Sequence, residues 1–195
     1  MRTDDRGLAL VDIVATLSLV LTTSAITVPV IGRTLEREYT VIGARHLAGL
    51  LMRARAEALR RSTAVAARFE TVDDRTRVRL FADGNGNGVL QRDIDRGTDR
   101  PVSEYEWLDV HGRDVSLRIN QSVVDPGGTG ILAPGSDPLR IGRSAFVTFG
   151  PLGGSSSGTL FVATRRGPQM AIRVFGGSGR VRVLTFDPRA GAWRL

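Results

Sequence analysis

The chain has 195 residues and a net charge of +7, and its length fits one ordinary domain plus an appendage, or two small domains. Hydrophobic residues make up 42% of it, enough for a packed core. It has no cysteine, which excludes disulfide frameworks, cysteine nucleophiles and thiolate metal sites. All 27 basic residues are arginine, and the lack of lysine excludes a Walker A phosphate site, a Schiff-base lysine and a kinase-type lysine.

The positive charge gathers at the carboxyl end. Residues 140–195 contain nine arginines against a single acid, Asp187. A basic surface attracts polyanions such as nucleic acid or anionic lipid headgroups. The alternative is that arginine usage without lysine reflects the coding bias of the source genome.

The first predicted element is a long apolar helix after a polar leader, residues 1–7. Leu8–Ile31 is interrupted by one ionised group, Asp12. At about 1.5 Å per residue this helix spans roughly 36 Å, enough for a hydrocarbon core of about 30 Å. The alternative, an ordinary secretory signal, has an apolar core of only about 7–15 residues. The pattern favours a membrane-spanning helix over residues 8–31.

Asp12 needs a partner inside such a helix, because a carboxylate there costs about 2.5–3.5 kcal/mol. Cleavage between Gly7 and Leu8 frees an amino group close to Asp12 in sequence. In an assembly, the amine of one subunit can pair with Asp12 of the next within a low-dielectric bundle.

Gly7-Leu8-Ala9-Leu10-Val11-Asp12, preceded by Arg6, resembles the processing site of type IV pilins and type II secretion pseudopilins. In that family a prepilin peptidase cuts after the glycine, the new amino terminus is methylated, and the acid guides subunit assembly. Pro29 matches the family's helix-kinking proline, whose missing N–H breaks the helical ladder. The resemblance implies a single-pass inner-membrane protein with its globular domain in the periplasm. Its implied partners are the peptidase and other pilins or pseudopilins in a filament.

Residues 32–62 are predicted to continue as an amphipathic helix, with one apolar face formed at helical spacing by Leu47, Leu50, Leu51, Ala54 and Ala58. Strand patterns follow at 64–69 and 76–81, where Val78 and Leu80 alternate with arginines. Further strands are predicted at 105–110, 115–120, 145–149, 158–164, 170–175 and 180–186. Residues 100–143 are rich in Gly, Pro and Asp, which favours long loops.

Residues 44–69, 149–153, 157–160 and 179–183 resemble the GspH/FimT subfamily of minor pseudopilins and minor pilins. The implied class is α+β with a type IV pilin-like fold. A long amino-terminal helix, half membrane-spanning and half amphipathic, packs against small antiparallel sheets. The expected parts are a leader (1–7), a transmembrane helix (8–31), an amphipathic helix (32–62) and a periplasmic β-rich domain (63–195).

One stretch resembles the first half of a calcium loop. Its oxygen ligands are Asp83, Asn85 and Asn87, with Gly88 at the sixth place. The twelfth place is Ile94 instead of an acid, although Asp93 and Asp95 flank it. The alternative is a metal-free Asn-Gly hairpin, because Asn and Gly readily adopt positive φ. No other cofactor is expected.

Gly179-Arg180-Val181-Arg182 puts two guanidinium groups on one side of a strand, because alternate residues share a face. Arg173, Arg165 and Arg166 lie nearby in sequence and extend a candidate phosphate-binding stripe. In FimT-type minor pilins a glycine-arginine-x-arginine arrangement is associated with DNA uptake, which implies double-stranded DNA as a partner. The alternative is that these arginines only solvate an edge strand.

Enzymatic chemistry is not expected. His46 and His111 show no partner pattern, and each is predicted to be a packing or surface residue. Residues 154–158 formally fit a nucleophile elbow, but a strand pattern follows instead of a helix. The prediction is therefore a non-enzymatic minor pseudopilin or minor pilin, with a DNA-capturing pilin and a signal-anchored periplasmic hydrolase as alternatives.

Overall fold

The computed structural model describes residues 5–128, 130–142 and 145–195, with side chains omitted for residues 5–9 and 26–30. The chain is mixed α+β, with a long amino-terminal helix and antiparallel sheets, as the sequence predicts. It forms two compact units, Met1–Leu35 and Glu36–Leu195.

Helix α1 (Asp5–Arg61) supplies the whole of the first unit's secondary structure and opens the second. In the second unit its predicted apolar face is buried: Leu47, Leu51, Ala54 and Ala58 are each fully inaccessible to solvent. The helix ends where predicted, because Ser62 adopts a left-handed conformation with φ of 52°. The amide of Thr63 still bonds to the carbonyl of Ala58 at 3.3 Å.

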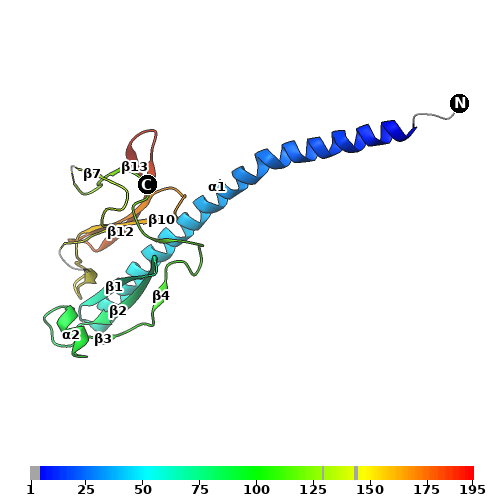
Figure 1. Cartoon of the computed structure of the whole chain (residues 1–195). Helices are drawn as coiled ribbons and strands as arrows, with labels where there is room; N and C mark the ends of the chain where they lie inside the picture. The colour runs from blue at the N-terminus through cyan, green and yellow to red at the C-terminus, as the bar shows by residue number, and fades with distance from the viewer. Residues whose placement is uncertain (1–4, 129, 143–144) are drawn as a thin grey trace. The chain divides into compact units, whose positions relative to one another are not determined.

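The first sheet is antiparallel, with strand order β3-β2-β1-β9 and β4 also pairing with β2 (Figure 1). Val78 and Leu80 point into the core and are each 2% exposed, as the alternation of strand 76–81 predicts. The strands of this sheet are β1 (Val65–Val72), β2 (Arg75–Ala82), β3 (Arg100–Pro101), β4 (Glu106–Trp107) and β9 (Phe146–Phe149).

The second sheet is also antiparallel, with strand order β13-β12-β11-β10-β5 and β8 pairing with β10. Strand β10 is buried along its whole length, and β11 is buried except at Arg173 and Phe175, which explains why both strands are mainly apolar. The strands are β5 (Ser116–Leu117), β8 (Leu139–Arg140), β10 (Gly158–Ala163), β11 (Met170–Phe175), β12 (Arg180–Asp187) and β13 (Ala192–Arg194).

Short elements fill the region that was predicted to be looped. Within residues 100–143 these elements are β3, β8 and the two-stranded pair β6 (Val123–Val124) and β7 (Ile131–Leu132). Helix α2 (Gln91–Asp95) and β13 lie outside that region and were not predicted either. The strands predicted at 105–110 and 115–120 shrink to two residues each, β4 and β5.

One core joins helix α1 to both sheets within the second unit. It combines helix residues such as Leu47 and Leu51 with Val65 and Leu80 of the first sheet and Ile172 of the second. A buried polar link joins the sheets, since the Thr76 and Ser116 hydroxyl oxygens lie 2.8 Å apart. A second cluster, on the other face of the second sheet, contains Phe161, Ala171, Phe186, Ile119, Val123, Leu132 and Trp193.

Candidate functional site

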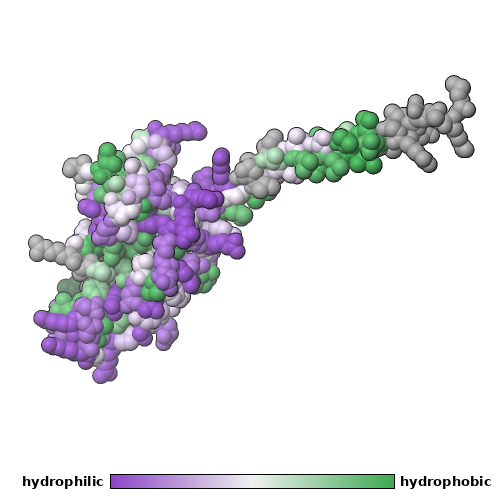
Figure 2. Space-filling view, viewed as in Figure 1, coloured by the Kyte–Doolittle hydropathy of each residue, from purple (hydrophilic) through white to green (hydrophobic). Residues whose placement is uncertain are grey.

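The amino-terminal unit exposes a continuous apolar surface. Leu10, Leu17, Leu19 and Leu21 are between 56% and 68% exposed, and Figure 2 shows hydrophobic residues along this described stretch of the helix. The threonine hydroxyls turn back onto the helix; that of Thr16 donates to the carbonyls of residues 12 and 13 at 2.9 Å. Each such bond satisfies a polar group internally, which suits an apolar environment.

Asp12 is exposed, and within the described residues its carboxylate makes no ion pair. Gly7, Leu8 and Pro29 lie outside the residues whose side chains the structure describes, although helix α1 runs through all three positions. Within the described ranges of the chain, no helix has the length and hydropathy that crossing a bilayer requires.

The structure brings together three of the candidate arginines on the second sheet. Arg173 of β11 lies directly opposite Arg182 of β12, and Phe175 lies opposite Arg180. The guanidinium carbons of Arg173 and Arg182 lie 5.9 and 5.7 Å from the Phe175 ring centroid. We call Arg173, Phe175, Arg180 and Arg182 the arginine cluster.

The arginine cluster lies on the face of the sheet turned away from helix α1. Val181 and Val183 pack toward the main core, so the alternating Arg180 and Arg182 point the other way. Arg173 donates a hydrogen bond to the Thr159 hydroxyl at 2.8 Å. In the described part of the chain, no carboxylate pairs with Arg173, Arg180 or Arg182. Their positive charges are therefore available to an external anion.

A cavity of about 480 Å³ adjoins the arginine cluster at Arg173. Arg140 also lines it, but the Arg140 Nε lies 3.2 Å from Asp125 Oδ2. Gly127 lies close to the Arg173 guanidinium, and a Cβ at this position would make the end of that side chain shift.

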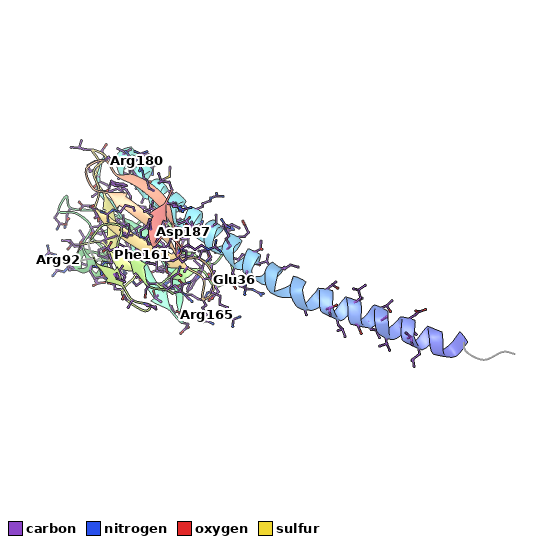
Figure 3. The ribbon with its side chains drawn as sticks, turned by 90° about the horizontal axis from the view of Figure 1, so that it is seen from above. Glu36, Arg92, Phe161, Arg165, Arg180 and Asp187 are labelled. Atoms are coloured by element: carbon purple, nitrogen blue, oxygen red, sulfur yellow. The ribbon has the colours of Figure 1, made fainter. Side chains whose placement is uncertain are left out.

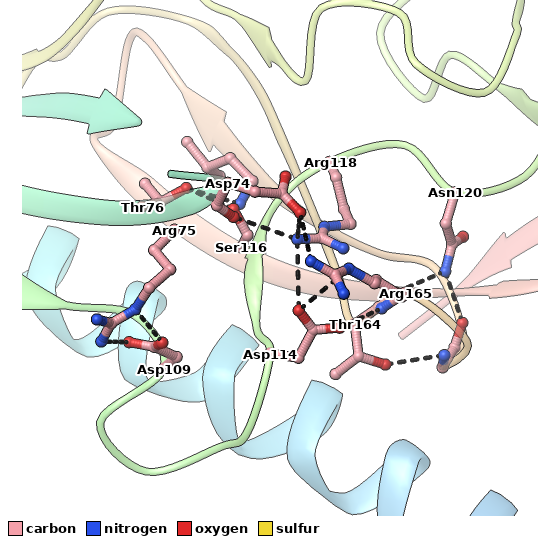
Figure 4. A network of polar contacts seen from close by, with 12 residues as sticks. Asp74, Arg75, Thr76, Asp109, Asp114, Ser116, Arg118, Asn120, Thr164 and Arg165 are labelled. Carbon is pink, nitrogen blue, oxygen red and sulfur yellow. Dashed lines mark hydrogen bonds and ion pairs between the residues drawn. The ribbon is translucent and has the colours of Figure 1, made fainter. Parts of the chain in front are cut away.

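Arg165 and Arg166 do not join the arginine cluster. They lie in the turn between β10 and β11, while Arg180 follows the turn at the other end of β11; Figure 3 shows Arg165 and Arg180 far apart. Arg165 Nη2 lies 3.2 Å from Asp74 Oδ2, and Arg165 Nε lies 3.6 Å from Asp114 Oδ1. Its hydrogen bond to Asp74 raises the pKa of Arg165. Arg118 joins the same network, shown in Figure 4.

The candidate calcium loop uses its oxygens internally. Asp83 accepts hydrogen bonds from the amides of Asn85, Gly86 and Gly88 at 2.8 to 3.0 Å. The Asn87 amide group donates to Asp93 Oδ2 at 3.0 Å, and this bond lowers the pKa of Asp93. Asp95 instead accepts from Gln91 at 2.7 Å. Across the described residues, no group of three or more acids or histidines is arranged to hold a metal ion. The loop is not the predicted Asn-Gly hairpin, because helix α2, and not a second strand, follows it at Gln91.

The two histidines meet, which sequence reasoning missed. The His46 and His111 ring centroids lie 5.1 Å apart in an edge-to-face arrangement. Burial lowers the pKa of His46, the nearby His111 lowers it further, and Glu106 opposes both effects. His46 Nε2 is buried and has no hydrogen-bond partner within the part of the chain that the structure describes. No local pattern signals this contact, because it depends on how the loop after β4 folds onto helix α1.

Comparison of the chain with protein-family models, curated proteins and solved structures finds no match.

Proposed function

We propose that the chain is a minor pseudopilin or minor pilin of the GspH/FimT type, with a type IV pilin-like fold. The observation that carries this proposal is the division of helix α1. Its described residues from Leu10 to Leu21 are exposed and, except for Asp12, Thr16 and Ser18, apolar. By contrast, Leu47, Leu51, Ala54 and Ala58 lie in the core of an α+β domain. An apolar surface of this size needs a cover of lipid or other subunits.

In the proposed mechanism, a prepilin peptidase cuts between Gly7 and Leu8, and the new amino terminus is methylated. Asp12 is then the fifth residue of the mature chain. Within a filament, the amino terminus of one subunit neutralises Asp12 of its neighbour, which offsets the cost of burying the carboxylate. Before assembly, the helix over residues 8–31 holds the chain in the inner membrane, with the β-rich domain in the periplasm. The protein acts by assembly, and no catalytic step is assigned to it.

Asp12 variants test this mechanism. The full chain is co-expressed with a prepilin peptidase and a major pilin or pseudopilin, and sheared filaments are probed for it. We expect Asp12→Ala to abolish incorporation while Asp12→Glu, which keeps the carboxylate, retains it. Equal incorporation of both variants would contradict the proposed charge pair.

Binding of double-stranded DNA is a second candidate function, favoured by the arginine cluster. Two guanidinium groups, those of Arg173 and Arg182, lie near the exposed Phe175 ring, and Arg180 is the cross-strand neighbour of Phe175. Among the described residues none of the three arginines pairs with a carboxylate. Phosphate contacts by these groups give affinity with little sequence preference and a steep dependence on salt.

A gel shift of the full chain in detergent tests this function. We expect Arg180→Gln with Arg182→Gln to weaken duplex binding and reduce its salt dependence. The matched control is Arg166→Gln with Arg189→Gln, which removes two exposed arginines near the other end of the strands. If both double variants lost DNA binding to the same extent, net charge alone would explain the loss. The arginine cluster would then not be a specific binding site.

A further inference from the structure

A row of polar side chains crosses the second sheet at one level. Thr159 of β10 pairs on one side with Arg140 of β8 and on the other side with Arg173 of β11. Arg173 in turn pairs with Arg182 of β12. Paired residues of antiparallel strands project from the same face, and neighbouring strands lie about 4.8 Å apart. The four side chains therefore share the face turned away from helix α1, and we call them the cross-strand row.

The cavity of about 480 Å³ is built on this row. Arg140, Thr159 and Arg173 line it, and the loop between β6 and β7 contributes Asp125 and Gly127. Thr159 is only 1% exposed, so the cavity reaches a buried part of the sheet. Its volume falls in the range of about 300–1,000 Å³ that is typical of small-molecule sites. We call it the sheet cavity.

The arginines of the sheet cavity offer unused N–H groups. Arg173 donates from Nη1 to the Thr159 hydroxyl at 2.8 Å, and Arg140 donates from Nε to Asp125 at 3.2 Å. Among the described residues, the other guanidinium N–H groups of these two arginines have no hydrogen-bond partner. Two guanidinium groups beside one hydroxyl suit a phosphate group, because a phosphate monoester offers three oxygens and up to about two negative charges.

The carboxylates of the sheet cavity offer acceptors instead. The Asp125 side chain is 12% exposed and accepts from Arg140 and from the amide of Gly127. Asp137 also lines the cavity; it accepts from the Leu139 amide at 2.9 Å and, within the described ranges, forms no ion pair. A carboxylate repels an anion but accepts a hydrogen bond from a hydroxyl group. A ligand that carries hydroxyl groups beside a phosphate therefore satisfies both sides of the cavity, whereas a simple anion satisfies one.

We infer that the sheet cavity binds a small phosphorylated sugar. Arg140, Thr159 and Arg173 hold its phosphate group, and Asp137 accepts hydrogen bonds from its hydroxyl groups. This binding site goes beyond filament assembly and duplex binding, and it rests on neither of them.

Calorimetric titration of the full chain in detergent tests the inference. The probes are ribose 5-phosphate, ribose and inorganic phosphate, compared at one pH and one salt concentration. We expect ribose 5-phosphate to bind about tenfold more tightly than either of the other two, because each of those makes only part of the contacts. Failure of ribose 5-phosphate to bind, or binding no tighter than that of inorganic phosphate, would overturn the inference.

Asp137→Ala separates the two kinds of contact. The substitution removes an acceptor for hydroxyl groups and also a charge that repels an anion. We therefore expect the affinity for ribose 5-phosphate, relative to that for inorganic phosphate, to fall about fivefold. An unchanged ratio of the two affinities would contradict the contact between Asp137 and the sugar.

Two glycines in the loop between β6 and β7 provide a matched pair of variants. A Cβ at Gly127 would make the end of the Arg173 side chain shift, whereas a Cβ at Gly130 meets no atom of the described chain within 4 Å. We expect Gly127→Ala to weaken the binding of ribose 5-phosphate about tenfold and Gly130→Ala to leave it unchanged. Circular dichroism checks that both variants fold. Equal affinities of the two folded variants would contradict the place of Arg173 in the site.

The gel shift with duplex DNA keeps this inference separate from the candidate DNA-binding function, because Arg173 belongs to both surfaces. Binding of ribose 5-phosphate without a gel shift would support the sheet cavity and remove the DNA function. A gel shift without binding of ribose 5-phosphate would overturn the sheet cavity and leave the DNA function standing. Neither measurement depends on cleavage after Gly7, so the pilin proposal is tested separately.

Discussion

The contact between helix α1 and the loop before β5 predicts opposite outcomes for two glycines of the same helix. At Gly43, a Cβ would lie 2.3 Å from Val115 Cγ1, and the Val115 side chain is 1% exposed. At Gly49, a Cβ meets no atom of the described chain within 4 Å. Alanine gains about 1 kcal/mol of helix propensity at either site. Overpacking at Gly43 costs about 1–3 kcal/mol, which outweighs that gain.

We therefore expect Gly43→Ala to lower the free energy of unfolding by up to about 2 kcal/mol, and Gly49→Ala to raise it by about 1 kcal/mol. For a chain of this length, each 1 kcal/mol moves the thermal midpoint by about 2–4 °C. Thermal unfolding of the full chain in detergent, followed by circular dichroism, measures both shifts.

A double-mutant cycle assigns the effect to Val115. Gly43→Ala combined with Val115→Ala should be more stable than the sum of the single changes by about 1 kcal/mol, because removal of the Cγ atoms relieves the clash. A Gly43→Ala protein as stable as Gly49→Ala would refute the packing of this loop against the helix.

Three further predictions concern polar groups. Hydrogen bonds from Arg60 and Arg61 lower the pKa of Glu57 to about 2. The ionised Glu57 carboxylate therefore stabilises the fold above about pH 4.5, and this stabilisation is lost as the pH falls toward 2. The difference in thermal midpoint between the native chain and Glu57→Gln should close over that interval, and a constant difference would contradict these ion pairs. The pKa of His46 is lowered, so the native chain should lose stability below about pH 6.5 while His46→Gln should not, as denaturant titration at several pH values would reveal. Gln169 is fully buried, and its side-chain amide donates hydrogen bonds to three backbone carbonyls at 3.0 to 3.2 Å. Gln169→Leu should lower the free energy of unfolding by about 3 kcal/mol. An unchanged free energy in the same denaturant titration would count against these hydrogen bonds.

The elements that the sequence predicted correctly are those with a local period. Leu47 and Ala58 of helix α1, and Val78 and Leu80 of β2, are buried because helical and strand spacing place them on one face. The short strands β6, β7 and β8 have two residues each, too few for a period to show.

The tertiary contacts of the candidate sites could not be predicted in this way. Arg165 and Arg173 are close in sequence, but Arg165 lies in the turn before β11 and Arg173 lies toward the far end of that strand. Arg165 pairs with acids from two distant loops. The same limit applies to His46 and His111, which come from a helix and a distant loop. Alternation along β12 did predict that Arg180 and Arg182 share a face, because it is a local property.

The mass of the mature chain tests the central claim most directly. The full chain is co-expressed with a prepilin peptidase, recovered from membranes and measured intact by mass spectrometry. The account predicts a protein that begins at Leu8 and carries one added methyl group on its amino terminus. A protein that still begins with residues 1–7 under conditions in which the peptidase cleaves a known pilin would contradict it.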